Sequence, residues 1–128
     1  MKAFVTVAAV ATAAAAGAHF AVAPEHFHEW WGFGTFFVVV GVAQLAWAAS
    51  PSNAAIGIGG NTALVVLWAL SRTTGLPFGP GAGTPEAIGP VDLASVLFQL
   101  TAVTALVANS FALTGGRIPF HLLQQEKT

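Results

Sequence analysis

The residues best able to do chemistry are crowded into one short segment, between positions 19 and 29. This segment holds three of the four histidines and two of the five acidic residues, namely His19, Glu25, His26, His28 and Glu29. Imidazole nitrogens and carboxylate oxygens are ligands for copper (Cu²⁺) and zinc (Zn²⁺), so these residues predict a transition-metal site. The chain has no cysteine and a single methionine at position 1, which disfavours the soft ligand set of Cu⁺.

Other interpretations of this histidine cluster (His19, His26 and His28) remain open at the level of sequence. Histidine and acidic residues also gather at membrane–water interfaces, where their polar ends stay solvated and hold no ligand. Because free imidazole titrates near pH 6.5, the cluster also suits proton transfer or pH sensing. Finally, the small residues at 16–18 resemble a signal-cleavage site, and cleavage there would make His19 an N-terminal residue that chelates copper, as in copper monooxygenases.

The elements that must position these residues are membrane-spanning helices. Only 7% of the 128 residues are charged and 55% are hydrophobic, whereas roughly a quarter of an average soluble domain is charged. These proportions exclude a soluble domain, which needs a polar surface, and a disordered chain, which needs low hydrophobicity. The net charge of −1 and the lack of a basic patch give no basis for binding nucleic acid.

Charged residues divide the sequence into long apolar stretches. The middle stretch, 30–71, is long enough for two crossings of a bilayer and contains a Ser-Pro-Ser-Asn turn at 50–53. Because backbone groups in lipid must be satisfied internally, we predict an all-α polytopic membrane protein, a four-transmembrane-helix bundle in one membrane domain, 1–128. The expected segments are spans near 3–23, 30–49, 54–71 and 93–114, an outer loop 72–92 and a tail 115–128.

The basic residues predict the orientation of these spans. Lys2, Arg117 and Lys127 fall at one end of the bundle, whereas Arg72 falls at the other end with four acidic residues. Since positive residues favour the cytoplasm, we expect both termini to be cytoplasmic and the histidine cluster to face outward. Alanine in the first span and glycine in the third provide faces for close packing against a second copy of the chain or a larger membrane protein.

Two further features concern how the outer end is built. The segment 72–92 contains four prolines and five glycines, and loops of this length are usually functional or disordered. We expect an ordered cap over the histidine cluster, with a plain connector as the alternative. Arg72 is expected to form a structural ion pair, with Glu86 and Asp92 as the named partners and Glu25 and Glu29 as alternatives. Asp92 is expected to cap the N-terminus of the fourth span.

Polar side chains inside the spans form a separate group. His19 lies about one turn inside the first apolar stretch, where an ionisable residue is either functional or hydrogen-bonded to a neighbouring helix. The candidate partners for that bond are Gln99 and Asn61. We expect the other buried polar residues, including Gln44 and Asn109, to act mainly as hydrogen-bonding contacts between helices.

The segments 19–30 and 68–80 resemble those of small four-span membrane proteins encoded in actinobacterial genomes. The first reads His-x6-His-x-His-Glu-Trp, and the second ends in Gly-Leu-Pro-Phe-Gly-Pro at 75–80. This resemblance implies a four-span fold in a bacterial cytoplasmic (inner) membrane, and it transfers no catalytic role.

Three functions fit these patterns. The first is a small membrane protein with an outward-facing His/Glu site for copper or zinc, capped by the Pro/Gly-rich loop. The second is an accessory or assembly subunit of a larger membrane complex. The third is a copper enzyme with His19 as its processed N-terminus. The residues specify no substrate or reaction, and a role other than enzyme is favoured.

Overall fold

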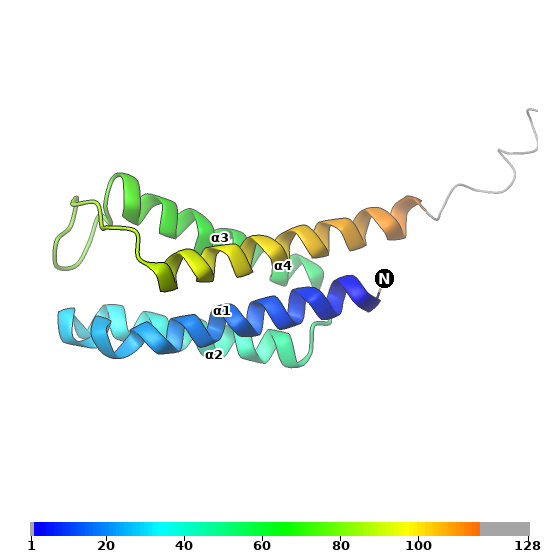
Figure 1. Ribbon diagram of the computed structural model, residues 1–128, viewed down its shortest axis with the longest axis horizontal. Coiled ribbons are helices and arrows are strands. Elements are labelled where there is room, and N and C mark those ends of the chain that lie inside the picture. The colour runs from blue at the N-terminus through cyan, green and yellow to red at the C-terminus, as the bar shows by residue number, and fades with distance from the viewer. Residues whose placement is uncertain (1, 116–128) are drawn as a thin grey trace, which may run out of the picture.

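Four helices make up the computed structural model, which describes residues 2–115 (Figure 1). They are α1 (Lys2–Glu29), α2 (Trp31–Ala49), α3 (Ala54–Thr73) and α4 (Pro90–Gly115). All four are long and apolar enough to span a membrane, and the described residues contain no strand. The predicted all-α, four-span fold is therefore confirmed. The tail residues Arg117, His121, Glu126 and Lys127 lie outside the described residues.

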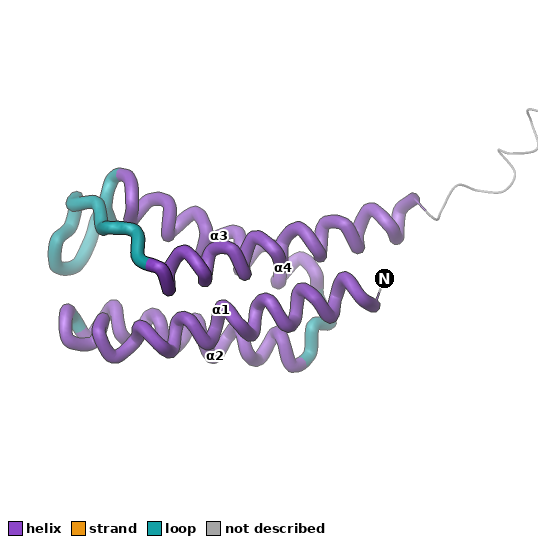
Figure 2. The backbone as a smooth tube through the Cα atoms, in the orientation of Figure 1, coloured by secondary structure: helices purple, strands orange, loops and turns teal. Residues whose placement is uncertain are grey.

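The helices run up and down and form two layers (Figure 1). Helix α1 packs against α2 and α4, and α4 also packs against α3. The helix termini define two ends of the bundle. At the Arg72 end, α1 and α3 finish and α2 and α4 begin, and the long loop 74–89 crosses this end (Figure 2). At the Lys2 end, a short turn at 50–53 joins α2 to α3.

Helix α1 continues through Pro24 to Glu29, although the sequence predicts that the span ends near residue 23. Proline lacks the N–H that would bond to the carbonyl four residues earlier, but one missing bond does not end this helix. The consequence is that His19 and His26, seven residues or two turns apart, lie on the same face of α1. A single extended residue, Trp30, then separates α1 from α2, and its N–H donates to the His26 carbonyl at 3.0 Å.

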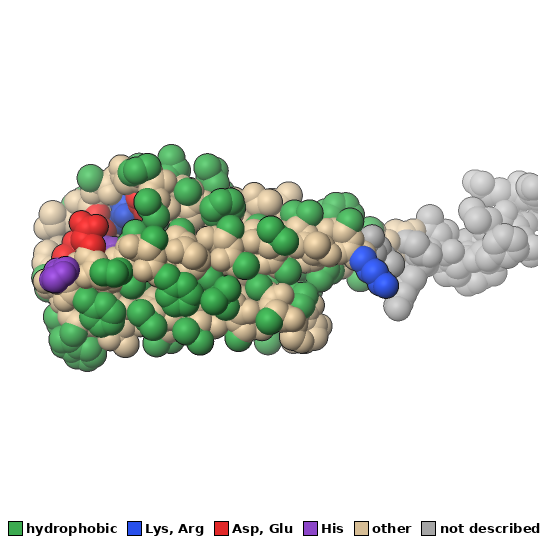
Figure 3. All heavy atoms as spheres, turned by 60° about the horizontal axis from the view of Figure 1, so that its bottom comes forward, with side chains coloured by type: hydrophobic (Ala, Val, Ile, Leu, Met, Phe, Trp, Pro, Cys, Tyr) green, Lys and Arg blue, Asp and Glu red, His purple; other side chains and the backbone are tan. Residues whose placement is uncertain are grey.

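Alanine allows the central helices α1 and α4 to approach closely. Ala8, Ala15 and Ala16 of α1 and Ala102 of α4 are fully buried, and Leu106 is the largest side chain in this core. Small residues of this kind permit close backbone contact between helices in lipid. Large apolar side chains such as Val10, which is 65% exposed, face outward instead. Figure 3 shows apolar side chains along the length of the bundle, with acidic and histidine side chains gathered at one end.

Two glycines of α3 provide a matched test of this packing. A Cβ atom at Gly57 would lie 2.4 Å from the Trp47 ring and 2.7 Å from Leu106 Cδ1. The Trp47 ring cannot move away freely, because its Nε1 donates to the Asn53 carbonyl at 2.9 Å. A Cβ at Gly59 would meet nothing within 4 Å.

We therefore predict opposite effects of the same substitution at these two glycines. Gly57→Ala should lower the free energy of unfolding by about 1–3 kcal/mol through overpacking. Gly59→Ala should raise it by up to about 1 kcal/mol, because alanine is the better helix former. Thermal unfolding of the purified variants in one detergent checks both. Equal effects of the two substitutions would mean that Gly57 does not mark a close contact.

Candidate functional site

A cavity of about 840 Å³ lies at the Arg72 end, between the four helices and the loop 74–89. Its walls are mainly aromatic and aliphatic, and the wall residues include Val22, Phe33, Phe36, Leu67 and Trp68. Polar side chains occur at two places, the floor inside the bundle and the mouth near the loop. Pockets of about 300–1,000 Å³ with apolar walls and a few polar groups are typical of small-molecule sites.

His19 forms the floor of this cavity and is only 7% exposed. Its Nδ1 lies 2.9 Å from Oε1 of Gln44 on α2, and its Nε2 lies 3.1 Å from Oγ of Ser95 on α4. An amide oxygen only accepts hydrogen bonds, so Nδ1 carries the proton and its N–H donates a hydrogen bond to Gln44. Nε2 then accepts a hydrogen bond from the Ser95 hydroxyl, with Gln99 Nε2 further away at 3.5 Å.

The hydrogen bonds continue from Gln44 away from the cavity. Gln44 Nε2 donates to Asn61 Oδ1 at 3.4 Å, and Asn61 Nδ2 donates to Thr12 Oγ1 at 3.2 Å and to the Gly57 carbonyl at 2.9 Å. We call the side chains from Ser95 through His19, Gln44 and Asn61 to Thr12 the buried polar chain. It connects all four helices, because its members come from α1, α2, α3 and α4.

The partners of His19 differ in part from those expected. Gln99 is its most distant contact, and Asn61 reaches it only through Gln44. Ser95, which is not among the expected partners, is the direct partner on α4. The sequence does contain a signal for Ser95. Asp92, Ser95 and Gln99 are spaced by the helical period, so these three residues share one face of α4.

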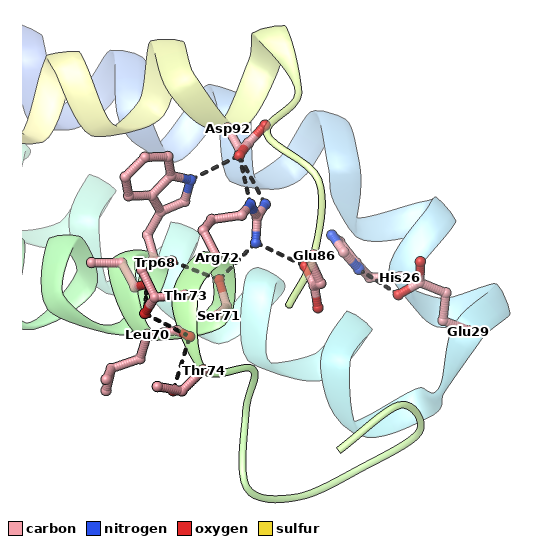
Figure 4. A network of polar contacts seen from close by, with 11 residues as sticks. His26, Glu29, Trp68, Leu70, Ser71, Arg72, Thr73, Thr74, Glu86 and Asp92 are labelled. Atoms are coloured by element: carbon pink, nitrogen blue, oxygen red, sulfur yellow. Dashed lines mark hydrogen bonds and ion pairs between the residues drawn. The ribbon is translucent and has the colours of Figure 1, made fainter. Parts of the chain in front are cut away.

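At the mouth of the cavity, Arg72 forms the centre of a polar cluster (Figure 4). Its Nη2 and Nε lie 2.8 and 3.2 Å from Asp92 Oδ2, and its Nη1 lies 2.8 Å from Glu86 Oε2. Nη1 also donates to Ser71 Oγ at 2.6 Å, and Trp68 Nε1 donates to Asp92 Oδ2 at 2.7 Å. The three residues named for the structural ion pair are thus in contact, and they join α3, the loop and α4.

The predicted role of Asp92 as an N-cap is wrong. Helix α4 begins at Pro90, so Asp92 lies within its first turn. The Leu93 N–H donates to the Gly89 carbonyl at 3.1 Å, and the Asp92 carboxylate accepts hydrogen bonds from Trp68 and Arg72. The carboxylate therefore ties α4 to α3 across the mouth of the cavity.

Across the mouth from Arg72, His26 and Glu29 form a second pair (Figure 4). His26 Nδ1 lies 2.9 Å from Glu29 Oε2. The His26 ring stacks on Phe37, with ring centroids 4.3 Å apart, and the His19 ring lies 5.6 Å from the same phenylalanine. Phe37 of α2 therefore fixes both imidazoles on the cavity-facing side of α1.

The structure brings together four of the five residues proposed as metal ligands, but only loosely. His19, Glu25, His26 and Glu29 line the cavity, whereas His28 is exposed and does not line it. His19 and His26 are separated by two helical turns, or roughly 10 Å along the axis. Within residues 2–115, no group of three or more His, Cys, Asp and Glu side chains has the arrangement needed to hold a metal ion. The metal site remains a prediction.

The loop 74–89 is held over the mouth by specific backbone contacts. The Glu86 N–H donates to the Ser71 carbonyl at 2.9 Å, and the Gly83 N–H donates to the Leu76 carbonyl at 2.8 Å. Gly75 has φ +76°, and a Cβ there would lie 2.5 Å from the backbone nitrogen of Thr84. Glycine is needed at this position for both reasons.

No known protein family, curated protein or solved structure matches the chain. The fold and the site define its class, a multi-pass membrane protein of four helices with a ligand-sized cavity at one end.

Proposed function

We propose that this protein binds a small, mainly apolar molecule in the cavity at the Arg72 end. The observation that carries this proposal is the cavity itself, about 840 Å³ between all four helices with aromatic and aliphatic walls. Its floor needs no polar partner from a ligand, because the His19 nitrogens are already hydrogen-bonded to Gln44 and Ser95. An apolar body therefore suits the interior, and any polar group of the ligand belongs at the mouth.

We further propose that the cavity opens on the outer side of a bacterial cytoplasmic membrane, with both termini in the cytoplasm. Lys2 at one end of the bundle, and Arg117 and Lys127 outside the described residues, favour a cytoplasmic location for that end. The bacterial membrane itself rests on the resemblance of the segments 19–30 and 68–80.

The cavity is tested by filling it. Val22→Trp/Leu67→Trp places two indoles on its walls, whereas Val10→Trp/Val66→Trp changes the outward faces of the same two helices. We predict that 4-phenylbutanol binds saturably to the wild type and the outward variant, and at least about tenfold more weakly to the filled variant. Isothermal titration calorimetry in dodecyl maltoside measures this. Identical heats for all three proteins would mean that the probe only enters the micelle.

A transition-metal site is the second candidate function, and one observation favours it. Both imidazoles of the cavity hold Nδ1 against an oxygen acceptor, His19 against Gln44 and His26 against Glu29. Such partners orient the imidazoles of metal sites. At His26 this leaves Nε2 for an ion, whereas Nε2 of His19 already accepts a hydrogen bond from Ser95. Titration with Cu²⁺ or Zn²⁺ tests this candidate, which requires that binding be lost in His26→Ala and retained in His28→Ala.

The two remaining functions stay predictions. A copper enzyme with His19 at its N-terminus would require removal of residues 1–18. Those residues include five of the seven buried side chains of α1, namely Ala8, Ala11, Thr12, Ala15 and Ala16. Cleavage would therefore remove most of the packing between α1 and α4. No observation on the described residues favours an accessory subunit over a protein that acts alone.

A further inference from the structure

The charges around the cavity are strongly unequal. Among residues 2–115, four carboxylates and one guanidinium line it, and their formal charges sum to −3. These groups belong to Glu25, Glu29, Glu86, Asp92 and Arg72. All five are at the mouth, where α1 ends, α4 begins and the loop crosses. A pocket with low-dielectric walls and charges of one sign concentrates ligands of the opposite sign.

Arg72, the single guanidinium of the lining, has little capacity left for an anionic ligand. Of its five N–H groups, four donate to side chains of the protein: two to Asp92, one to Glu86 and one to Ser71. Its charge is matched by the two carboxylates that it contacts. An anionic head group would have to displace one of these acids and would still face the others.

The acids of α1 are differently placed. Glu25 lines the cavity and forms no hydrogen bond or ion pair with any other side chain among residues 2–115. Among the same residues, the Glu29 carboxylate pairs only with His26, and the Glu29 side chain is 49% exposed. Trp30 and Phe33 line the same part of the mouth and pack edge to face, 5.1 Å apart. Aromatic ring faces attract ammonium groups and add to the attraction of the carboxylates.

We propose that the ligand of this cavity is an organic cation, an apolar body that carries one protonated amine. The ammonium group lies at the mouth beside Glu25 and Glu29, and the apolar body extends toward His19. The inference rests on the proposed function, since it names the class of ligand for the same cavity. The ammonium stays near water in this position, so its desolvation is small.

Three ligands of equal length and different charge test the proposal. They are 4-phenylbutylamine, 4-phenylbutanol and 4-phenylbutanoate, titrated by calorimetry at pH 7 in dodecyl maltoside. We expect the amine to bind at least tenfold more tightly than the alcohol, and the carboxylate to give no saturable heat. The signal of the cavity-filled variant Val22→Trp/Leu67→Trp is subtracted as micelle uptake.

The variant Glu25→Gln/Glu29→Gln identifies the source of the preference. It should weaken binding of the amine at least fivefold and leave binding of the alcohol within about twofold, because only the charge at the mouth changes. Raising NaCl from 0.05 to 1 M should reduce only the binding of the amine. Glu25→Gln alone keeps the His26–Glu29 pair and should show part of the same loss.

The outcomes separate the two proposals. Equal binding of amine and alcohol, or tighter binding of the carboxylate, would overturn the cationic ligand and leave the cavity function standing. Amine binding unaffected by the two Glu→Gln changes would overturn it as well. Heats for all three ligands that match those of the cavity-filled variant would overturn the proposed function itself.

Discussion

Arg72→Leu is expected to lower the free energy of unfolding by about 3–5 kcal/mol, the largest loss we predict for a single substitution. The Arg72 side chain is 13% exposed, and that of its partner Asp92 is 21% exposed. Removing the guanidinium leaves the Asp92 carboxylate among apolar helices with Trp68 Nε1 and the Gly89 N–H as its remaining donors. It also removes the ion pairs that link Arg72 of α3 to Asp92 of α4 and to Glu86 of the loop. Thermal unfolding in detergent, or titration with SDS, measures the loss.

Four variants show whether the loss comes from the ion pair. Asp92→Leu should also be destabilising, and the double variant Arg72→Leu/Asp92→Leu should lose less than the sum of the two single losses. Glu86→Gln should cost no more than about 1 kcal/mol, because its side chain is 43% exposed. Thr73→Ala, next to Arg72 on an exposed position, should have little effect. An Arg72→Leu protein as stable as Thr73→Ala would refute the structural role of the pair.

The sequence predicts the helices well because lipid constrains them strongly. Apolar length, the Ser-Pro-Ser-Asn turn and the positions of the few charges placed seven of the eight span boundaries within three residues of those observed. The exception is the end of α1, since hydropathy falls at Pro24 although the backbone continues as a helix to Glu29. Charge and hydropathy report where the chain meets water, and not where a helix ends.

The site was less predictable, because it depends on how each helix is rotated about its axis. The residue types at 19–29 indicate that the functional site lies at the Arg72 end of the bundle. The expected contacts among Arg72, Glu86 and Asp92 are also found at this end. The cavity and the buried polar chain depend on which side chains of different helices face each other. Periodicity within one helix places Ser95 and Gln99 on one face, but no feature of a single sequence pairs that face with His19.

His19→Leu is expected to give the second large effect, a loss of about 1–3 kcal/mol in the free energy of unfolding. Interhelical hydrogen bonds in membrane proteins average only about 0.6 kcal/mol each. This substitution, however, leaves both the Gln44 oxygen and the Ser95 hydroxyl without their partner inside the bundle. Unpartnered buried polar groups cost about 1–3 kcal/mol, so loss of the partner outweighs the modest strength of each bond.

The buried polar chain can be distinguished from separate contacts by a double-mutant cycle. If the chain acts as a unit, His19→Leu/Gln44→Leu should be less destabilising than the sum of the single variants by at least about 1 kcal/mol. Asn109→Leu is the matched control, because Asn109 is also a buried amide but its Oδ1 has no hydrogen-bond partner in the described structure. That substitution should be neutral or stabilising.

Ligand binding to the same His19→Leu variant separates a structural role from a functional one. In the proposed mode, the apolar end of the ligand points toward His19, whose nitrogens are occupied by Gln44 and Ser95. A leucine at the floor should therefore leave binding of 4-phenylbutanol unchanged or tighten it slightly, although the protein unfolds more easily. Calorimetry well below the unfolding temperature measures this. A tenfold loss of binding in the folded variant would mean that His19 contacts the ligand through a polar bond, and that the ligand enters in the opposite orientation.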